Sequence, residues 1–405
     1  MYNYHQFKNG IRLVFRRSHS AVAYSGVYIN IGSRDERGAD EGMAHFIEHS
    51  LFKGTAHRRS YHILNRIDGV GGELNAFTTK EETCIYATSL TEHLGRCLEL
   101  YSDVLFGSTF PEHELAKERE VVLEEIDSYR DTPSELIFDE YEEMAFEGHP
   151  IAHNILGTKK NVRHFTADAV RRFFASHYTT DRMVLTVVAN IDFARLVRLC
   201  ERYFADRPQL TSLADRSQAP VNHPFCRTVN RHTHQIHALI GCPAPNIFSP
   251  KRTAFTVLNN VLGGPAMNSR LNMAVRERYG FCYTIESQYV PFSDAGLCYI
   301  YAGLEPGFAD QATEIITREL ARFCQQPLTD RQLRLAKRQI IGQMTISNDQ
   351  GLNEMQSIGK GHLNYDHVDT LEEMAADVMA VTAAEIQDLA AELFAPQNIS
   401  YLYYK

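Results

Sequence analysis

The chain has 405 residues, of which 44% are hydrophobic and 22% charged, and its net charge is −9 at pH 7. This length allows two or three domains with sizeable cores. The negative charge and the lack of a basic tract give no reason to expect nucleic acid or an anionic membrane as a partner. No run of about 18 apolar residues occurs, so we expect no membrane-spanning helix. The N-terminal segment also lacks the apolar core of a secretory signal.

The eight cysteines are scattered and none forms a Cys-x-x-Cys pair. Most stand in apolar surroundings, which is typical of reduced, buried thiols and predicts a cytoplasmic location rather than disulfides or metal ligands.

Strand and helix patterns alternate along the first half. We expect strands at 10–15, 23–32, 71–79, 83–89 and 183–189, where apolar residues alternate or run continuously between Gly, Asn and Ser. We expect helices at 41–55, 60–69, 91–107, 111–130, 134–146 and 166–176, from apolar positions three or four apart. A polar segment with two prolines at 206–221 is the best linker candidate, which predicts domains at 1–205 and 222–405.

The second half resembles the first at a nearly constant spacing. The segment that begins at Phe165, with a helix, a short turn and a strand, has a counterpart that begins at Val381, 216 residues later. The helical segment at Glu114 resembles that at Arg334, 220 residues later. Two matches with nearly the same offset predict a duplicated α+β domain.

His45 and His49 stand four residues apart in the sequence His-Phe-Ile-Glu-His. In a helix the two imidazoles share one face and can bind one metal ion. Glu48 lies beside them and is placed to hold a water that the metal activates. This order is the inverse of the His-Glu-x-x-His zinc signature. The alternative is a pair of surface histidines on a helix.

A zinc site with two histidines needs a third protein ligand and an open position. Glu118 and Glu125 lie seven residues apart on the apolar stripe of the helix expected at 111–130, about 20° apart around its axis. Buried carboxylates are unfavourable unless they are paired or bound to a cation. We therefore expect Glu125 to be the third ligand and Glu118 to orient a ligand or tune the water. The alternative is that a basic residue pairs with each carboxylate.

These residues resemble the pitrilysin/insulinase family of inverzincin metallopeptidases, which is related to the mitochondrial processing peptidase, and its short bacterial branch in particular. The family's motif is His-x-x-Glu-His followed about 76 residues later by a glutamate, and Glu125 stands 76 residues after His49. A further glutamate, seven residues before that ligand, matches Glu118. The resemblance covers essentially the whole chain and implies two homologous α/β-sandwich domains, each an antiparallel-rich sheet covered by helices.

Other segments agree with the family. Gly71–Thr78 matches a glycine-rich turn into an edge strand that pairs with the substrate backbone in relatives. The resemblance thus implies substrate-binding roles for the four strand residues Asn75, Ala76, Phe77 and Thr78. Asn75 also fits a simple turn residue.

Arg276 and Tyr283 match the pair with which relatives bind substrate near the scissile bond. The resemblance implies that Arg276 clamps substrate carbonyls and that Tyr283 donates to the oxyanion. The alternative is an arginine at a helix end and a strand tyrosine, both packed in the core.

The resulting hypothesis is a zinc-dependent endopeptidase that acts on extended peptides. His45, His49 and Glu125 hold one Zn²⁺ per chain, and Glu48 is the general base. Relatives enclose the site in a chamber of four homologous domains, and this chain supplies two. The resemblance therefore implies a homodimer. The alternatives are a peptidase that processes one pro-peptide or presequence, a noncatalytic metal-binding assembly subunit, and a different metallohydrolase such as an amidase.

Overall fold

The computed structural model describes residues 1–212, 216–220 and 223–405. They form two compact units, neither of them continuous in sequence. The first comprises Met1–Asp127, His153–Ser217 and Ile346–Thr370, and the second comprises Ser128–Ala152, Gln218–Thr345 and Leu371–Lys405. Positions 213–215 and 221 of the expected linker lie outside the described residues. The mixed α/β fold with two helix-covered sheets confirms the expected fold class.

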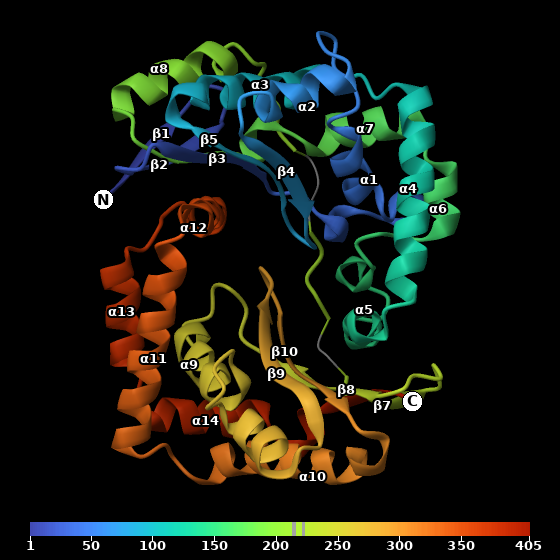
Figure 1. Ribbon diagram of the computed structural model, residues 1–405, viewed down its shortest axis with the longest axis vertical. Helices are drawn as coiled ribbons and strands as arrows, with labels where there is room; N and C mark the ends of the chain where they lie inside the picture. The colour runs from blue at the N-terminus through green and yellow to red at the C-terminus, as the bar shows by residue number, and fades with distance from the viewer. Residues whose placement is uncertain (213–215, 221–222) are drawn as a thin grey trace. The chain divides into compact units, whose positions relative to one another are not determined.

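The first unit is built on a six-stranded sheet in the order β1-β2-β6-β3-β5-β4 (Figure 1). Its strands are β1 (Tyr2–Gln6), β2 (Arg12–Arg17), β3 (Val22–Ile29), β4 (Glu73–Thr78), β5 (Thr83–Leu90) and β6 (Met183–Ala189). Strand β6 is buried along its whole length, because helices cover both faces of the sheet. Tyr28, Val184 and Val188 pack against Met355 and Ile358 on one face. On the other face Ser25 bonds to Tyr101, since successive side chains of a strand point to opposite sides.

The second unit is built on a five-stranded sheet in the order β7-β11-β8-β10-β9. Its strands are β7 (Cys226–Val229), β8 (Ile236–Pro243), β9 (Cys282–Pro291), β10 (Gly296–Leu304) and β11 (Ser400–Tyr404). Leu239 and Tyr299 pack against Tyr141 on one face. Ile240 and Ile300, their neighbours along the strands, belong to a separate core cluster on the other.

The helices follow a similar order along the two halves of the chain. In the first half they are α1 (Met43–Ser50), α2 (Ser60–Asp68), α3 (Leu94–Gly107), α4 (Glu112–Arg130), α5 (Pro133–Ala145), α6 (Lys159–His164), α7 (Ala167–His177) and α8 (Phe193–Phe204). In the second half they are α9 (Arg252–Gly263), the π-helix η6 (Asn272–Glu277), α10 (Ala309–Gln325), α11 (Asp330–Asn348), α12 (Gly351–Tyr365), α13 (Leu371–Ala380) and α14 (Ala383–Leu393).

The two sheets share one strand topology. Strand β2 runs parallel to β6 in the first sheet, as β7 does to β11 in the second. The next three pairings are antiparallel in both sheets. The segments that resemble each other in sequence are equivalent elements, with α7 and β6 matching α14 and β11, and α4 matching α11. The shared topology supports the duplication inferred from the sequence.

One helix of each half packs on the sheet built from the other half. Helix α5 contacts β8 and β11 of the second sheet, whereas α12 contacts β3 and β6 of the first. The compact units therefore differ from the continuous ranges 1–205 and 222–405 expected from the sequence. An amphipathic pattern shows which face of a helix is buried but not which sheet buries it.

Helix α1 is shorter than the expected 41–55. It follows Gly42, whose φ of 95° is outside the helical range, and it ends at Ser50. Gly54 and Thr55 instead form isolated β-bridges with Arg59 and Ser108, so the chain is extended there. Among the described residues, no helix combines the length and apolar character needed to cross a bilayer.

Candidate metal centre

Helix α1 presents both histidines of the His-x-x-Glu-His motif on one face. Met43, Ala44, Phe46 and Ile47 are buried in the first unit, which fixes the helix by its apolar side. The imidazoles of His45 and His49 lie with ring centroids 4.7 Å apart. His45 is buried and only 8% exposed, so the alternative of two surface histidines does not describe it.

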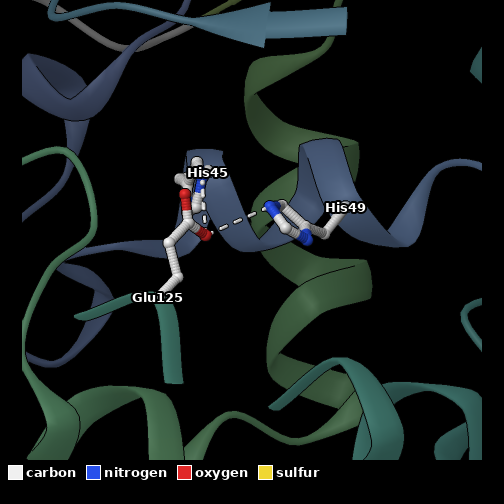
Figure 2. Close-up of side chains that lie close together, drawn as sticks. All are labelled: His45, His49 and Glu125. Carbon is white, nitrogen blue, oxygen red and sulfur yellow. Dashed lines mark ion pairs between the residues drawn. The ribbon is translucent and has the colours of Figure 1, made fainter. Parts of the chain in front are cut away.

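Glu125 reaches the same point from α4. Its Oε2 lies 3.7 Å from His45 Nε2 and 3.5 Å from His49 Nε2 (Figure 2). One possible ligand atom from each of the three residues lies within 4.8 Å of the other two. Two imidazole nitrogens and one carboxylate oxygen suit zinc, and three protein ligands leave one coordination position open. The structure thus brings together the three residues that the sequence predicted as metal ligands.

The environment of this group fits a bound cation. Burial and the adjacent His49 lower the pKa of His45 to about 3, which keeps its imidazole neutral and available as a ligand. Glu125 is more exposed than expected, with 43% of its side chain accessible. Its Oε2 is nevertheless buried and has no hydrogen-bond partner within the described part of the chain. A buried carboxylate oxygen without a donor is unfavourable unless a cation compensates it.

Glu118 holds the far side of the second imidazole. Its Oε2 lies 3.4 Å from His49 Nδ1, and its Oε1 lies 2.6 Å from Lys53 Nζ. Burial alone would raise the pKa of Glu118, but its bonds to His49 and Lys53 lower it below the ordinary value. The carboxylate can therefore fix His49 with Nδ1 engaged and Nε2 turned toward Glu125. From the sequence, the alternative for this carboxylate was pairing with a basic residue. Glu118 has such a partner in Lys53, and it also contacts His49.

The sequence predicted no role for Lys53. Lys53 follows α1 in the segment Leu51–Thr55. The β-bridges of Gly54 and Thr55 hold the chain just after it, and its Nζ contacts Glu118. In the sequence Lys53 is a single cation shortly after the motif. Nothing in the pattern indicates that its partner is Glu118, 65 positions away.

Glu48 lies on α1 between the histidines and contacts strand β4. Burial raises the pKa of Glu48. The Thr78 hydroxyl on that strand and the charge of His49 act against this rise, and Glu125 adds to it. The other oxygen, Oε2, is buried and has no hydrogen-bond partner among residues that the structure describes. Glu48 Oε2 is therefore available to accept a proton.

Strand β4 carries the four residues predicted to bind substrate. It is the last strand of its sheet and pairs only with β5 among the described residues. The Asn75 side chain accepts a hydrogen bond from the backbone N–H of Ala76 at 2.8 Å, so it is engaged locally. An unpaired strand edge is a template for another extended chain.

Arg276 and Tyr283 lie together in the second unit. Arg276 lies in the last turn of the π-helix η6, and its guanidinium stands 5.5 Å from the centre of the Tyr283 ring on β9. Tyr283 is 78% exposed, which contradicts the alternative that it packs in the core. π-Helical turns occur frequently at functional sites.

Two sheets of one topology, one of them beside a His-His-Glu group, form the architecture expected of an inverzincin peptidase. Residues 12–159 match "Insulinase (Peptidase family M16)" and residues 164–340 match "Peptidase M16 inactive domain". The chain belongs to peptidase family M16, the pitrilysin/insulinase family that its sequence resembles.

Relatives and solved structures agree with this assignment. "Uncharacterized zinc protease YmxG" of Bacillus subtilis (strain 168) is 34% identical over 388 residues, which cover 96% of this chain and 94% of that protein. An "Uncharacterized zinc protease" of Rickettsia bellii is 28% identical over 407 residues, 98% of this chain and 96% of that one. A protease from Helicobacter pylori has the same fold, with a TM-score of 0.95, 18% identity, and coverage of 100% of this chain and 99% of that chain.

Proposed function

We propose that this protein is a zinc-dependent endopeptidase that hydrolyses extended peptides. The observation that carries the proposal is the convergence of His45, His49 and Glu125 beside Glu48, with buried carboxylate oxygens that have no hydrogen-bond donor in the described ranges. The relatives named as zinc proteases support it. A structural metal site would have no use for Glu48, since only hydrolysis needs a base at that position.

His45, His49 and Glu125 would hold one zinc ion, with Glu118 keeping His49 oriented. Zinc bound there supplies Lewis acidity, which polarises the scissile carbonyl and acidifies a water. Glu48 accepts the proton of the attacking water and passes it to the leaving amine. The Thr78 hydroxyl favours the charged form of Glu48, and Oε2 of Glu48 is available to accept the proton.

The free edge of β4 would take the substrate as an added strand. Backbone pairing along Asn75–Thr78 reads extended shape more than sequence, so the substrates are peptides or unfolded segments. In this strand Thr78 also favours the charged form of Glu48. The Asn75 side chain binds the backbone N–H of Ala76. Recognition then depends on main-chain hydrogen bonds and favours broad specificity.

Arg276 and Tyr283 would act on the same substrate from the second unit. The cation–π contact orients the pair, and the exposed phenol is free to donate to a developing oxyanion. We propose a homodimer whose four domains enclose the peptide. The eight free cysteines support a cytoplasmic location. Mixing Glu48→Gln chains with Tyr283→Phe chains tests the dimer: recovery of activity indicates sites shared between chains, and no recovery refutes sharing.

The peptidase is tested with a quenched-fluorescence peptide and purified protein. Glu48→Gln should lower kcat by about 10² to 10⁴ with zinc still bound, because the base is lost and the ligands remain. Glu124→Gln, an exposed carboxylate on α4, is the matched control and should leave activity unchanged. Wild-type activity in Glu48→Gln, or activity that survives a zinc chelator, would refute the mechanism. Zinc binding without any peptidase activity would favour a noncatalytic subunit.

A further inference from the structure

The metal-bearing helix begins without a cap of its own. Its N-cap residue, Gly42, has no side chain, and the first N–H groups of any helix lack partners within that helix. Glu36, six residues upstream, takes this role. Its Oε2 accepts the N–H of Gly42 and its Oε1 accepts the N–H of Ala44, both at 2.6 Å. One carboxylate therefore bridges two backbone donors at the start of α1.

Glu36 is an unusual residue to find there, because it is only 1% exposed. No Arg, Lys or His forms an ion pair with it within residues 1–212, 216–220 and 223–405. An isolated buried carboxylate is costly. Burial raises the pKa of Glu36 well above its ordinary value, and the two backbone bonds from Ala44 and Gly42 act against this rise. The positive end of the α1 dipole favours a negative group at the same place. Its interactions are therefore directed at α1.

A second segment fixes the same helix start from the other side. A Cβ added to Gly42 would lie 2.8 Å from the carbonyl oxygen of Leu156 and 2.9 Å from Gly157 Cα. A Cβ on Gly157, whose φ is 68°, would lie 2.4 Å from the carbonyl oxygen of Glu41. The backbone at Gly42 is thus held between the Glu36 carboxylate and the segment at Leu156. His45 is the next residue after Ala44, so its position depends directly on this turn.

We infer that Glu36 is a positioning residue for the metal centre: by binding the N–H groups of Gly42 and Ala44 it sets the first turn of α1 and places His45 against Glu125. This inference rests on the proposed zinc site. It extends that site to a residue that contacts neither metal nor substrate. Small errors in the placement of a metal ligand weaken binding, because zinc requires its ligands in one geometry.

The test compares two buried carboxylates of the first unit. Glu36→Gln keeps the shape of the side chain but replaces one acceptor oxygen with an N–H₂ group that cannot accept. Glu354→Gln is the matched control. Glu354 on α12 is also 1% exposed, but its carboxylate pairs with Arg16 and not with α1. The measurements are the zinc dissociation constant by chelator competition, the visible spectrum of the Co²⁺-loaded protein, and thermal unfolding.

Glu36→Gln should weaken zinc binding about 10- to 100-fold and alter the Co²⁺ spectrum, which reports ligand geometry. Glu354→Gln should lower the unfolding temperature while zinc affinity and spectrum remain those of the wild type. If Glu36→Gln does not fold, Glu36→Asp keeps the charge on a shorter side chain and should show the same weakening.

Two results would overturn the inference alone. One is wild-type zinc affinity and spectrum in the Glu36 variants, with only a stability loss like that of Glu354→Gln. The other is failure of both Glu36 variants to fold, which would make the residue purely structural. A wild-type protein that binds no zinc would instead refute the proposed function, and the inference would fall with it.

Discussion

Replacing Lys53 with methionine should weaken zinc binding although Lys53 does not contact the metal ligands. Its Nζ lies 2.6 Å from Glu118 Oε1, and Glu118 Oε2 lies 3.4 Å from His49 Nδ1. Without the ammonium group, the pKa of Glu118 rises and its carboxylate holds His49 less firmly. Methionine retains most of the aliphatic stem, so packing changes little.

The expected size follows from the order of the contacts. Losing a direct partner of a metal-binding histidine costs about 10- to 100-fold in affinity. Lys53 acts one contact further out, and 25% of its side chain is exposed, so solvent screens part of its effect. We therefore expect about a tenfold increase in the zinc Kd, or about 1.4 kcal/mol.

The assay is competition with a chelator of known zinc affinity. Lys117→Met is the matched control, because Lys117 pairs with Glu114 at 3.0 Å and 65% of its side chain is exposed. This variant should bind zinc as the wild type does. Unchanged affinity in Lys53→Met, or an equal loss in Lys117→Met, would refute the chain of contacts from Lys53 to the imidazole.

Two further predictions concern stability. Gly157→Ala should destabilise the protein by about 3 kcal/mol, because the new Cβ would meet the Glu41 carbonyl oxygen at 2.4 Å. Gly148→Ala has a similar positive φ but open space, and should cost about 1 kcal/mol in urea unfolding; equal costs would contradict the steric argument. Asp103→Asn tests a pH dependence. Burial would raise the pKa of Asp103, but bonds from neighbours including Arg58 lower it. This depressed folded pKa adds stability above about pH 4, which is lost as pH falls through it. The wild-type advantage over Asp103→Asn should therefore shrink in acid; a constant difference would exclude this linkage.

The parts of the site that the sequence predicted depend on local helix geometry. His45 and His49 share a face because they are four residues apart in a helix, and Glu118 and Glu125 share a face because they are seven apart. Each arrangement needs only the period of one helix. The convergence of α1 and α4 followed from the family's spacing, and the geometry agrees with it.

The contacts that the sequence did not predict join segments without a periodic pattern. Glu36 reaches α1 from an irregular stretch after a short 3-10 helix at Ser33–Asp35. Lys53 reaches Glu118 from a turn. Position in such segments is set by bridges, caps and tight glycine contacts, which depend on the assembled fold. The strand order was not predicted for the same reason, because it depends on the assembled fold: β6 pairs with β2 and β3, which lie more than 150 residues before it in the chain.

Because α5 and α12 each pack on the sheet of the other half, the two halves depend on each other during folding. The face of the first sheet that bears Tyr28 and Val184 is closed by Met355 and Ile358 of α12. This apolar face is therefore covered only when α12 (Gly351–Tyr365), far along the chain, is in place. Helix α5 likewise comes before β8 and β11, the strands on which it packs, in the sequence. A chain shortened before α12 should therefore expose this apolar face, and an exposed apolar face makes a partly folded chain prone to aggregate.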